Sequence, residues 1–218
     1  MTLEDHGAAH LPGAAAPFLD ALEVALAGQP RDRAGIRLHA VPGLAMLLAH
    51  DALGRCAARL LGPDTRPVRA ILFDKSDAGN WALGWHQDRT IAVTARAEVP
   101  GYGPWSLKAG LQHVEPPFAV IERMLTLRIH LDPVDADNAP LLVAPGSHRL
   151  GRLPDGQIDS AVARCGVAPC EAERGDVWLY ATPIVHASAA AVRPRRRRVV
   201  QVDYSADRLP PPLDWLGV

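Results

Sequence analysis

The sequence predicts a mainly β fold with flanking helices, and a jelly roll fits it best. Two stretches near the N-terminus have helical periodicity. From residue 67 onward, short runs rich in Val, Ile, Leu and aromatic residues alternate with clusters of Pro, Gly, Asp and Asn. Many short strands without helical patterns between them favour an antiparallel sandwich or small barrel over alternating strands and helices.

The N-terminal region contains two predicted helices, over residues 16 to 27 and 43 to 61. In each, apolar residues recur at the spacing of one helix face. The two apolar stripes consist of Leu19, Leu22 and Leu26, and of Leu44, Leu48, Cys56 and Leu60. We expect residues 1–66 to form a helical segment packed on a core formed by residues 67–218, all within a single domain.

Six strands are predicted in the rest of the chain. They span residues 68–74, 90–95, 124–132, 140–144, 175–180 and 197–204. The segment from residue 98 to 117 has too many Pro and Gly residues for a regular element, whereas its aromatic residues argue against disorder. Loops of this length in compact domains are usually functional, so we expect a lid over a site.

The composition is that of an ordinary globular protein. The formal net charge of -1 gives no overall attraction to nucleic acid or acidic membranes. The apolar stretches are far shorter than the roughly 20 residues that span a bilayer, and the first residues do not resemble a secretory signal. We therefore expect a cytoplasmic protein with a small-molecule substrate, and no nucleic-acid or membrane partner. Cys56, Cys165 and Cys170 match neither a disulfide framework nor a common zinc spacing.

His86 and Asp88 are the best candidates for part of a metal site. They lie two residues apart in GWHQD, so on an extended strand both side chains leave from one face and can bind one ion. Fe(II) that binds dioxygen and a cosubstrate together needs three protein ligands on one side, which two histidines and one carboxylate supply. A second, distant histidine is therefore required.

His186 is the preferred third ligand, with His113, His130 and His148 as alternatives. It follows the apolar strand GDVWLY and a short loop, and it lies eleven residues before Arg197, which opens the alternating strand RRVVQVDYS. An arginine there can form a bidentate pair with a carboxylate whose other end chelates the metal. The spacing therefore predicts a 2-oxoglutarate site.

The run from Arg193 to Arg198 could also be a nucleic-acid patch. Alternation along a strand argues against it, because one face can serve a pocket while the other is solvated. Arg195 and Arg198 remain alternatives to Arg197 as the residue that binds 2-oxoglutarate.

Four ordered motifs over roughly residues 68 to 205 resemble the phytanoyl-CoA dioxygenase-like family. They are WHQD at Trp85 to Asp88, DNAPLLVAPGSHRLG at Asp137 to Gly151, GDVWLY followed by His186, and the spacing to Arg197. The resemblance implies a cupin-like double-stranded β-helix, Fe(II), 2-oxoglutarate and O2 as reactants, and succinate and CO2 as coproducts. Because the halogenating relatives lack the carboxylate, Asp88 favours hydroxylation. Two departures are Ala139, where the family usually has glycine, and Arg128, where it often has another residue.

Further residues are predicted around the cosubstrate and the substrate. Lys75 resembles a lysine found at this place in one bacterial branch of the family, and Lys75 and Arg128 are candidates to contact 2-oxoglutarate. Candidates for the substrate pocket are Trp85, Trp105, Lys108 and His130. The structural alternatives are an exposed lysine at a strand end and aromatic residues in the core. The alternative function is a metal-binding jelly roll that does not turn over or does not use 2-oxoglutarate.

Overall fold

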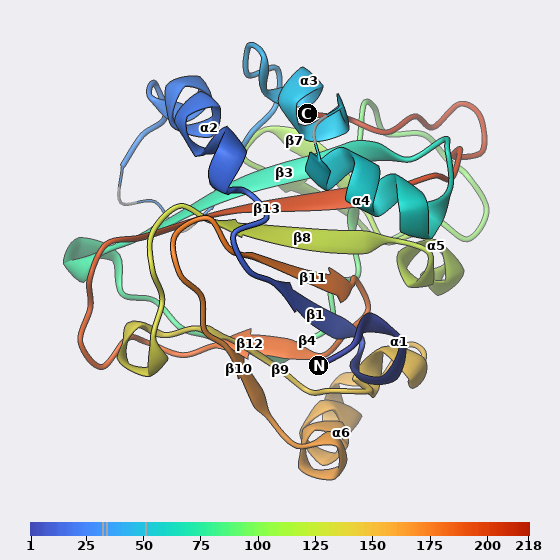
Figure 1. The fold of residues 1–218 in the computed structure, drawn as a ribbon. Helices are drawn as coiled ribbons and strands as arrows, with labels where there is room; N and C mark the ends of the chain where they lie inside the picture. The colour runs from blue at the N-terminus through green and yellow to red at the C-terminus, as the bar shows by residue number, and fades with distance from the viewer. Residues whose placement is uncertain (32, 34, 51) are drawn as a thin grey trace.

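The structure is a computed structural model that describes residues 1–31, 33, 35–50 and 52–218. Two facing antiparallel sheets form its centre, and helices cover the outer face of the larger sheet (Figure 1). The larger sheet has the order β1-β11-β8-β13-β3-β2, and the smaller has the order β10-β9-β12-β4. This is the arrangement of a helix-flanked jelly roll.

Alternation along the strands of the larger sheet divides its residues between two faces. On β13, for example, Val200 and Val202 point to the outer face and join the main apolar cluster, whereas Gln201 and Asp203 point to the inner face. The strands of this sheet are β1 (Ala8–Leu11), β2 (Ile36–Arg37), β3 (Arg66–Lys75), β8 (Leu125–His130), β11 (Val177–Ala181) and β13 (Arg197–Ser205). Its inner face carries several polar and charged side chains. Burial of such groups in a purely structural core would be unfavourable.

The smaller sheet closes the other side of the interior. Its strands are β4 (Leu83–His86), β9 (Leu141–Val143), β10 (Ala168–Cys170) and β12 (His186–Ser188). β12 pairs with both β4 and β9, and His186 lies directly opposite His86. Short loops and single turns link these elements, including η2 (Asp77–Gly79), η3 (Ala136–Asn138), η4 (Ser147–Arg149) and η5 (Asp155–Gln157).

The N-terminal helices pack against the outer face of the larger sheet. Leucines of both predicted stripes, including Leu22, Leu44 and Leu48, are fully buried there. The N-terminal helices are α1 (Leu3–His6), η1 (Ala16–Phe18), α2 (Leu19–Leu26), α3 (Leu44–His50) and α4 (Ala52–Leu61). Two further helices, α5 (Phe118–Glu122) and α6 (Ile158–Cys165), lie later in the chain. Within the described part of the chain, no helix has the length and apolar character needed to cross a membrane.

The predicted helix over residues 43 to 61 is two helices, α3 and α4. The predicted stripe therefore fails at Leu60, which is 51% exposed, and Leu53 and Ala57 are buried instead. Gly54 lies where the two helices approach each other. A Cβ there would come within 2.2 Å of the Ala49 carbonyl oxygen, so this position has no room for a side chain.

The expected irregular lid over residues 98 to 117 contains a β-hairpin. Its strands β6 (Trp105–Lys108) and β7 (Leu111–Val114) join β5 (Ile91–Val93) in a third sheet. Ala109 and Gly110 both have positive φ, at 52° and 79°, as a tight two-residue hairpin turn requires. Gly110 therefore forms part of the turn, and the other glycine and proline residues of the segment lie before or after the hairpin.

Candidate metal centre

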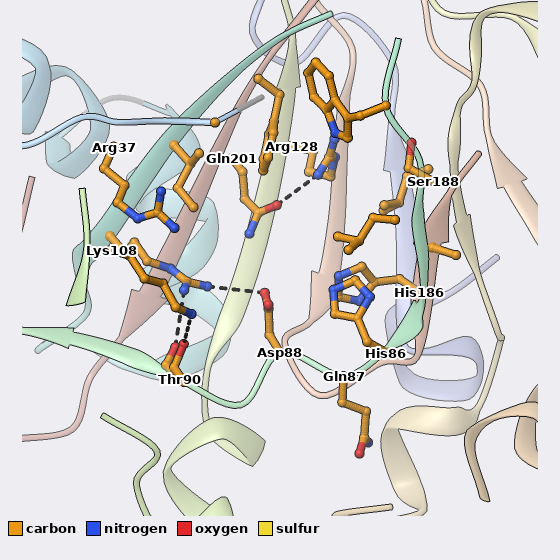
Figure 2. A pocket seen from close by; sticks show the side chains of 18 of the residues that line it. Arg37, His86, Gln87, Asp88, Thr90, Lys108, Arg128, His186, Ser188 and Gln201 are labelled. Carbon is orange, nitrogen blue, oxygen red and sulfur yellow. Dashed lines mark hydrogen bonds and ion pairs between the residues drawn. The ribbon is translucent and has the colours of Figure 1, made fainter. Parts of the chain in front are cut away.

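A cavity of about 750 Å³ lies between the two facing sheets. Its wall includes His86, Asp88 and His186 from the smaller-sheet side, and Arg128, Arg197 and Gln201 from the inner face of the larger sheet (Figure 2). The polar inner face of the larger sheet is thus the wall of a polar cavity.

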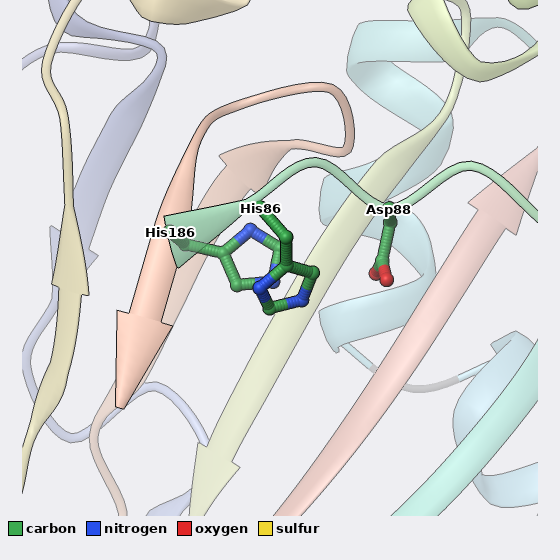
Figure 3. Close-up of side chains that lie close together, drawn as sticks. All are labelled: His86, Asp88 and His186. Atoms are coloured by element: carbon green, nitrogen blue, oxygen red, sulfur yellow. The ribbon is translucent and has the colours of Figure 1, made fainter. Parts of the chain in front are cut away.

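His86, Asp88 and His186 converge at one point (Figure 3). One potential ligand atom from each residue lies within 4.8 Å of those of the other two. Pairing of β4 with β12 brings the two histidines together, with ring centroids 4.3 Å apart. Asp88 lies two residues after the end of β4, and its carboxylate faces the same point as the His86 ring (Figure 3).

Backbone contacts orient both imidazoles. His86 Nδ1 lies 2.8 Å from the Gly84 carbonyl oxygen, and His186 Nδ1 lies 2.9 Å from the Ile184 carbonyl oxygen. A carbonyl can only accept, so Nδ1 carries the proton and Nε2 keeps its lone pair. Burial, and then the neighbouring His86, lower the pKa of His186 to about 4. Both rings are thus prepared to bind a metal through Nε2.

Arg69 holds the carboxylate of the triad. Its Nη2 lies 3.2 Å from Asp88 Oδ2, and its Nε donates to the buried Asp203. Burial raises the pKa of Asp88, but Arg69 and then His186 more than offset this, so the net shift is downward. Burial also opposes the charge on Arg69, but Asp203 and then Asp88 outweigh it and raise the pKa of Arg69. The carboxylate that faces the histidines is therefore ionised.

This donor set fits a divalent transition metal. Two neutral imidazoles and one carboxylate from one side are the ligands of open non-haem Fe(II) sites. Among the described residues, this is the only group of three or more His, Cys, Asp or Glu side chains close enough to hold an ion. His113, His130 and His148, the alternative third ligands, are not part of it.

Arg197 lies on the cavity wall at the start of β13, opposite Lys75 of β3. It is 3% exposed, and its Nη1 donates to the Ala139 carbonyl oxygen while its buried Nε has no partner among the described residues. Burial, and then Arg128, lower the pKa of Arg197 to about 9. Ala139, whose carbonyl accepts from Arg197, has a left-handed backbone, with φ of 52°, at the position where the family usually has glycine. A buried guanidinium without a carboxylate partner is suited to an anionic ligand.

Of the other two arginines considered for this role, Arg195 pairs with Asp135 and Arg198 pairs with Asp132 and Glu23. Both therefore already have carboxylate partners, and neither lines the cavity.

The two other cosubstrate candidates lie beside Arg197 on the same sheet. Arg128 lines the cavity and donates from Nη1 to Gln201 Oε1 over 2.9 Å. Lys75 is fully buried, its Nζ donates to the Ala189 carbonyl oxygen over 2.7 Å, and it does not line the cavity. Burial, and then Arg197, lower the pKa of Lys75 to about 8. The alternative of an exposed lysine at the strand end is therefore wrong.

The four substrate-pocket candidates have different locations. Lys108 lines the cavity. Trp85 does not, because alternation on β4 turns it away from the His86 side and into a separate apolar cluster. Trp105 packs against the apolar cluster around the third sheet, and His130 is buried within the larger sheet at 2% exposure. The structure thus brings one of these four residues to the cavity.

The family of the chain follows from its sequence. The sequence pattern of the phytanoyl-CoA dioxygenase (PhyH) family matches residues 34–199. This chain belongs to that family. Membership confirms the predicted family, and it confirms the predicted class of enzyme, a dioxygenase. No curated protein sequence matches the chain at a significant level.

Several solved structures share the fold of this chain. EctD from S. alaskensis with 2-oxoglutarate and 5-hydroxyectoine has a TM-score of 0.68 at 20% identity, with 99% of this chain and 77% of that chain covered. AviO1 from Streptomyces viridochromogenes Tue57 has a TM-score of 0.61 at 22% identity, with 96% and 94% covered. HygX from Streptomyces hygroscopicus with nickel, 2-oxoglutarate and hygromycin B has a TM-score of 0.63 at 13% identity, with 93% and 84% covered. The predicted jelly roll is confirmed.

The sequence of this PhyH family member did not lead us to several polar residues of the cavity wall, among them Arg37, Arg69 and Gln201. Arg69 and Gln201 come from the inner face of the larger sheet, and Arg37 comes from β2. Gln201 and Arg69 could have been flagged as polar residues within otherwise apolar strands. Arg37 has no such signal, because β2 is only two residues long.

Proposed function

We propose that this chain is an Fe(II)- and 2-oxoglutarate-dependent dioxygenase that hydroxylates a small or medium-sized organic molecule. His86, Asp88 and His186 are the proposed metal ligands, and Arg197 is the proposed partner of the distal carboxylate of 2-oxoglutarate. The observation that carries the proposal is the convergence of this triad and an arginine without a carboxylate partner on one cavity. Fe(II), 2-oxoglutarate and O2 would supply the oxidation: one oxygen atom of O2 would enter the substrate as a hydroxyl group, and the other would enter succinate as 2-oxoglutarate loses CO2.

The side chains of this protein would bind and orient the reactants. The Nδ1 contacts of His86 and His186 to the backbone fix which nitrogen faces the metal. Arg69 keeps Asp88 ionised and in place. Arg197 and Arg128 would hold the cosubstrate at one end of the cavity. Lys75 lies opposite Arg197 on β3, but its own Nζ donates to a backbone carbonyl.

Small-molecule substrates are supported by the proteins with this fold. The structures of EctD and HygX contain 5-hydroxyectoine and hygromycin B, respectively, together with 2-oxoglutarate. A cavity of about 750 Å³ is of the size that such ligands occupy. A cytoplasmic location remains a prediction from the sequence.

The proposal can be tested by anaerobic titration of Fe(II) and 2-oxoglutarate into the apo protein. We expect a visible metal-to-ligand charge-transfer band in the wild type, no band in His186→Ala, and a requirement for much more 2-oxoglutarate in Arg197→Ala. Arg195→Ala is the matched control, because Arg195 is exposed and paired with Asp135. A folded, iron-loaded wild type without a band would contradict the proposal and favour a metal-binding jelly roll.

A further inference from the structure

A second group of cations lies in the cavity, away from Arg197. Arg37 of β2 and Lys108 of β6 both line the wall near Asp88. In Figure 2 they lie on one side of Asp88, whereas His86 and His186 lie on the other. The charges of Arg37, Arg69 and Asp88 all shift the pKa of Lys108, so these groups lie close to its ammonium.

Neither cation has a carboxylate partner among the described residues. Lys108 Nζ donates to the neutral Thr90 Oγ1 over 3.0 Å, and the buried Nε of Arg37 has no hydrogen-bond partner. Burial, and then Arg69, lower the pKa of both side chains. By contrast, Arg89 on the same wall pairs with Asp155, and Arg69 pairs with Asp88 and Asp203.

The proposed metal and cosubstrate supply no negative charge to neutralise Arg37 and Lys108. Asp88 is the only carboxylate among the described residues of the cavity wall, and it would be bound to the metal. The cosubstrate would place one carboxylate at the metal and the other at Arg197. Among the described residues and these cofactors, no anion then remains for Arg37 and Lys108, and partly desolvated cations without an anion are unfavourable.

The strand register separates this group from Arg197. Arg37 lies opposite Ile71 on β3, Ile71 lies opposite Gln201 on β13, and Gln201 is four residues beyond Arg197. Four residues along a strand and two strand spacings place the Cα atoms of Arg37 and Arg197 roughly 16 Å apart. The two cationic groups therefore lie at different ends of the cavity.

We propose that Arg37 and Lys108 bind an oxyanion of the substrate, so that the substrate is an organic acid with a carboxylate or phosphate group. This inference rests on the proposed function, because it assigns the other end of the cavity to 2-oxoglutarate. A guanidinium donates two parallel hydrogen bonds to such a group, and an ammonium adds a point charge. Arg37 and Lys108 line the wall near Asp88, so an anion held there would leave the rest of the substrate beside the metal.

The test measures anion binding near the metal without turnover. The protein is loaded with Mn(II) and saturating 2-oxoglutarate, and the paramagnetic relaxation enhancement is followed for the ³¹P nucleus of phenyl phosphate and the ¹³C-labelled carboxylate of benzoate. Benzyl alcohol is the uncharged control. We expect a saturable enhancement for at least one of the two anions and none for benzyl alcohol, and the responding anion distinguishes a phosphate from a carboxylate substrate.

Variants assign the binding to the two residues. We expect Arg37→Gln and Lys108→Gln each to weaken anion binding about tenfold or more, since each removes charge-assisted hydrogen bonds. Arg152→Gln is the matched control, because Arg152 pairs with Glu115 and does not line the cavity. The inference is overturned if neither anion binds to the wild type, if both variants bind as the wild type does, or if anion binding weakens in proportion to further added 2-oxoglutarate.

The charge-transfer band of the Fe(II) protein shows whether a negative result contradicts only the organic-acid substrate or the proposed dioxygenase function as well. A normal band without anion binding contradicts the organic-acid substrate alone. A missing band in the wild type contradicts the proposed function and this inference together.

Discussion

Arg69 links the metal site to the interior of the larger sheet. It is 9% exposed and contacts two carboxylates, Asp88 at the cavity and Asp203 beneath it. Asp203 also accepts from Thr126 Oγ1 over 3.0 Å. The position of one proposed metal ligand therefore depends on a buried network that the short motif HQD does not contain.

Replacing Arg69 tests this network. Arg69→Met leaves two carboxylates without their cation, so we expect the free energy of unfolding to fall by about 3–5 kcal/mol. We also expect about 10- to 100-fold weaker Fe(II) binding, because Asp88 loses the contact that orients it. Chemical denaturation and metal titration of the apo protein measure the two effects. In the Arg69→Met background, Asp203→Asn should restore part of the stability, and strictly additive effects would argue against the pairing.

At the scale of the element, β13 separates two kinds of arginine by alternation. Arg197 faces the cavity, whereas Arg198, and Arg196 directly before β13, face outward and pair with acidic residues, Arg196 with Asp74 and Arg198 with Asp132 and Glu23. This division could be predicted from the sequence, since it depends only on the period of a strand. The position of Arg37 beside Lys108 could not, because it depends on how β2 and the third sheet pack against distant strands.

Opposite effects are expected for Arg197 and Arg198. Arg198→Gln removes the outward ion pairs, so we expect about 1 kcal/mol less stability and unchanged 2-oxoglutarate binding. Arg197→Met removes a buried cation that lacks a carboxylate partner, so the apo protein should gain about 1–2 kcal/mol while 2-oxoglutarate binding weakens strongly. Chemical denaturation and the charge-transfer titration provide the measurements. Equal effects of both variants on the titration would show that the two faces are not separated.

The N-terminal strand β1 depends on a close contact at Gly7. Gly7 has φ of 73°, and a Cβ there would lie 2.2 Å from His148 Nδ1. His148, which lies in the single turn η4, thus has a packing role.

Gly7→Ala should destabilise more than Gly13→Ala. Gly13 has a similar φ of 64°, but a Cβ added there would meet no atom within 4 Å, so this position carries the backbone strain alone. We expect Gly13→Ala to cost about 1 kcal/mol, and Gly7→Ala to cost about 1–3 kcal/mol more through overpacking. Thermal melts compare the pair, and equal losses would mean that the His148 ring moves aside freely.

At the scale of the whole molecule, the central strands of the larger sheet could be predicted from the sequence better than the short strands of the smaller sheet that faces it. All six predicted strands are present, because each contains a run of apolar or alternating residues, although β5 and β9 have only three residues each. The strands it missed, such as β4 and β12, have three or four residues and carry the metal-site histidines in place of an apolar pattern. Short strands of this kind are specified by their partners across the interior, which a local pattern does not record.

Buried neutral histidines should make the stability of the whole protein depend on pH. Burial, and then Arg128, lower the pKa of His130 to about 3, and burial lowers that of His113 to about 4. Below an unfolded pKa of about 6.5, the unfolded chain binds protons that the folded protein does not, so stability falls as the pH decreases toward these folded values. His130 alone accounts for about 2 kcal/mol between pH 6.5 and 5. Denaturation of the apo protein across this range should therefore show a smaller loss in His130→Leu than in the wild type, whereas His39→Gln, which removes an exposed histidine, should retain the wild-type slope. An unchanged slope in His130→Leu would mean that His130 is protonated in the folded protein.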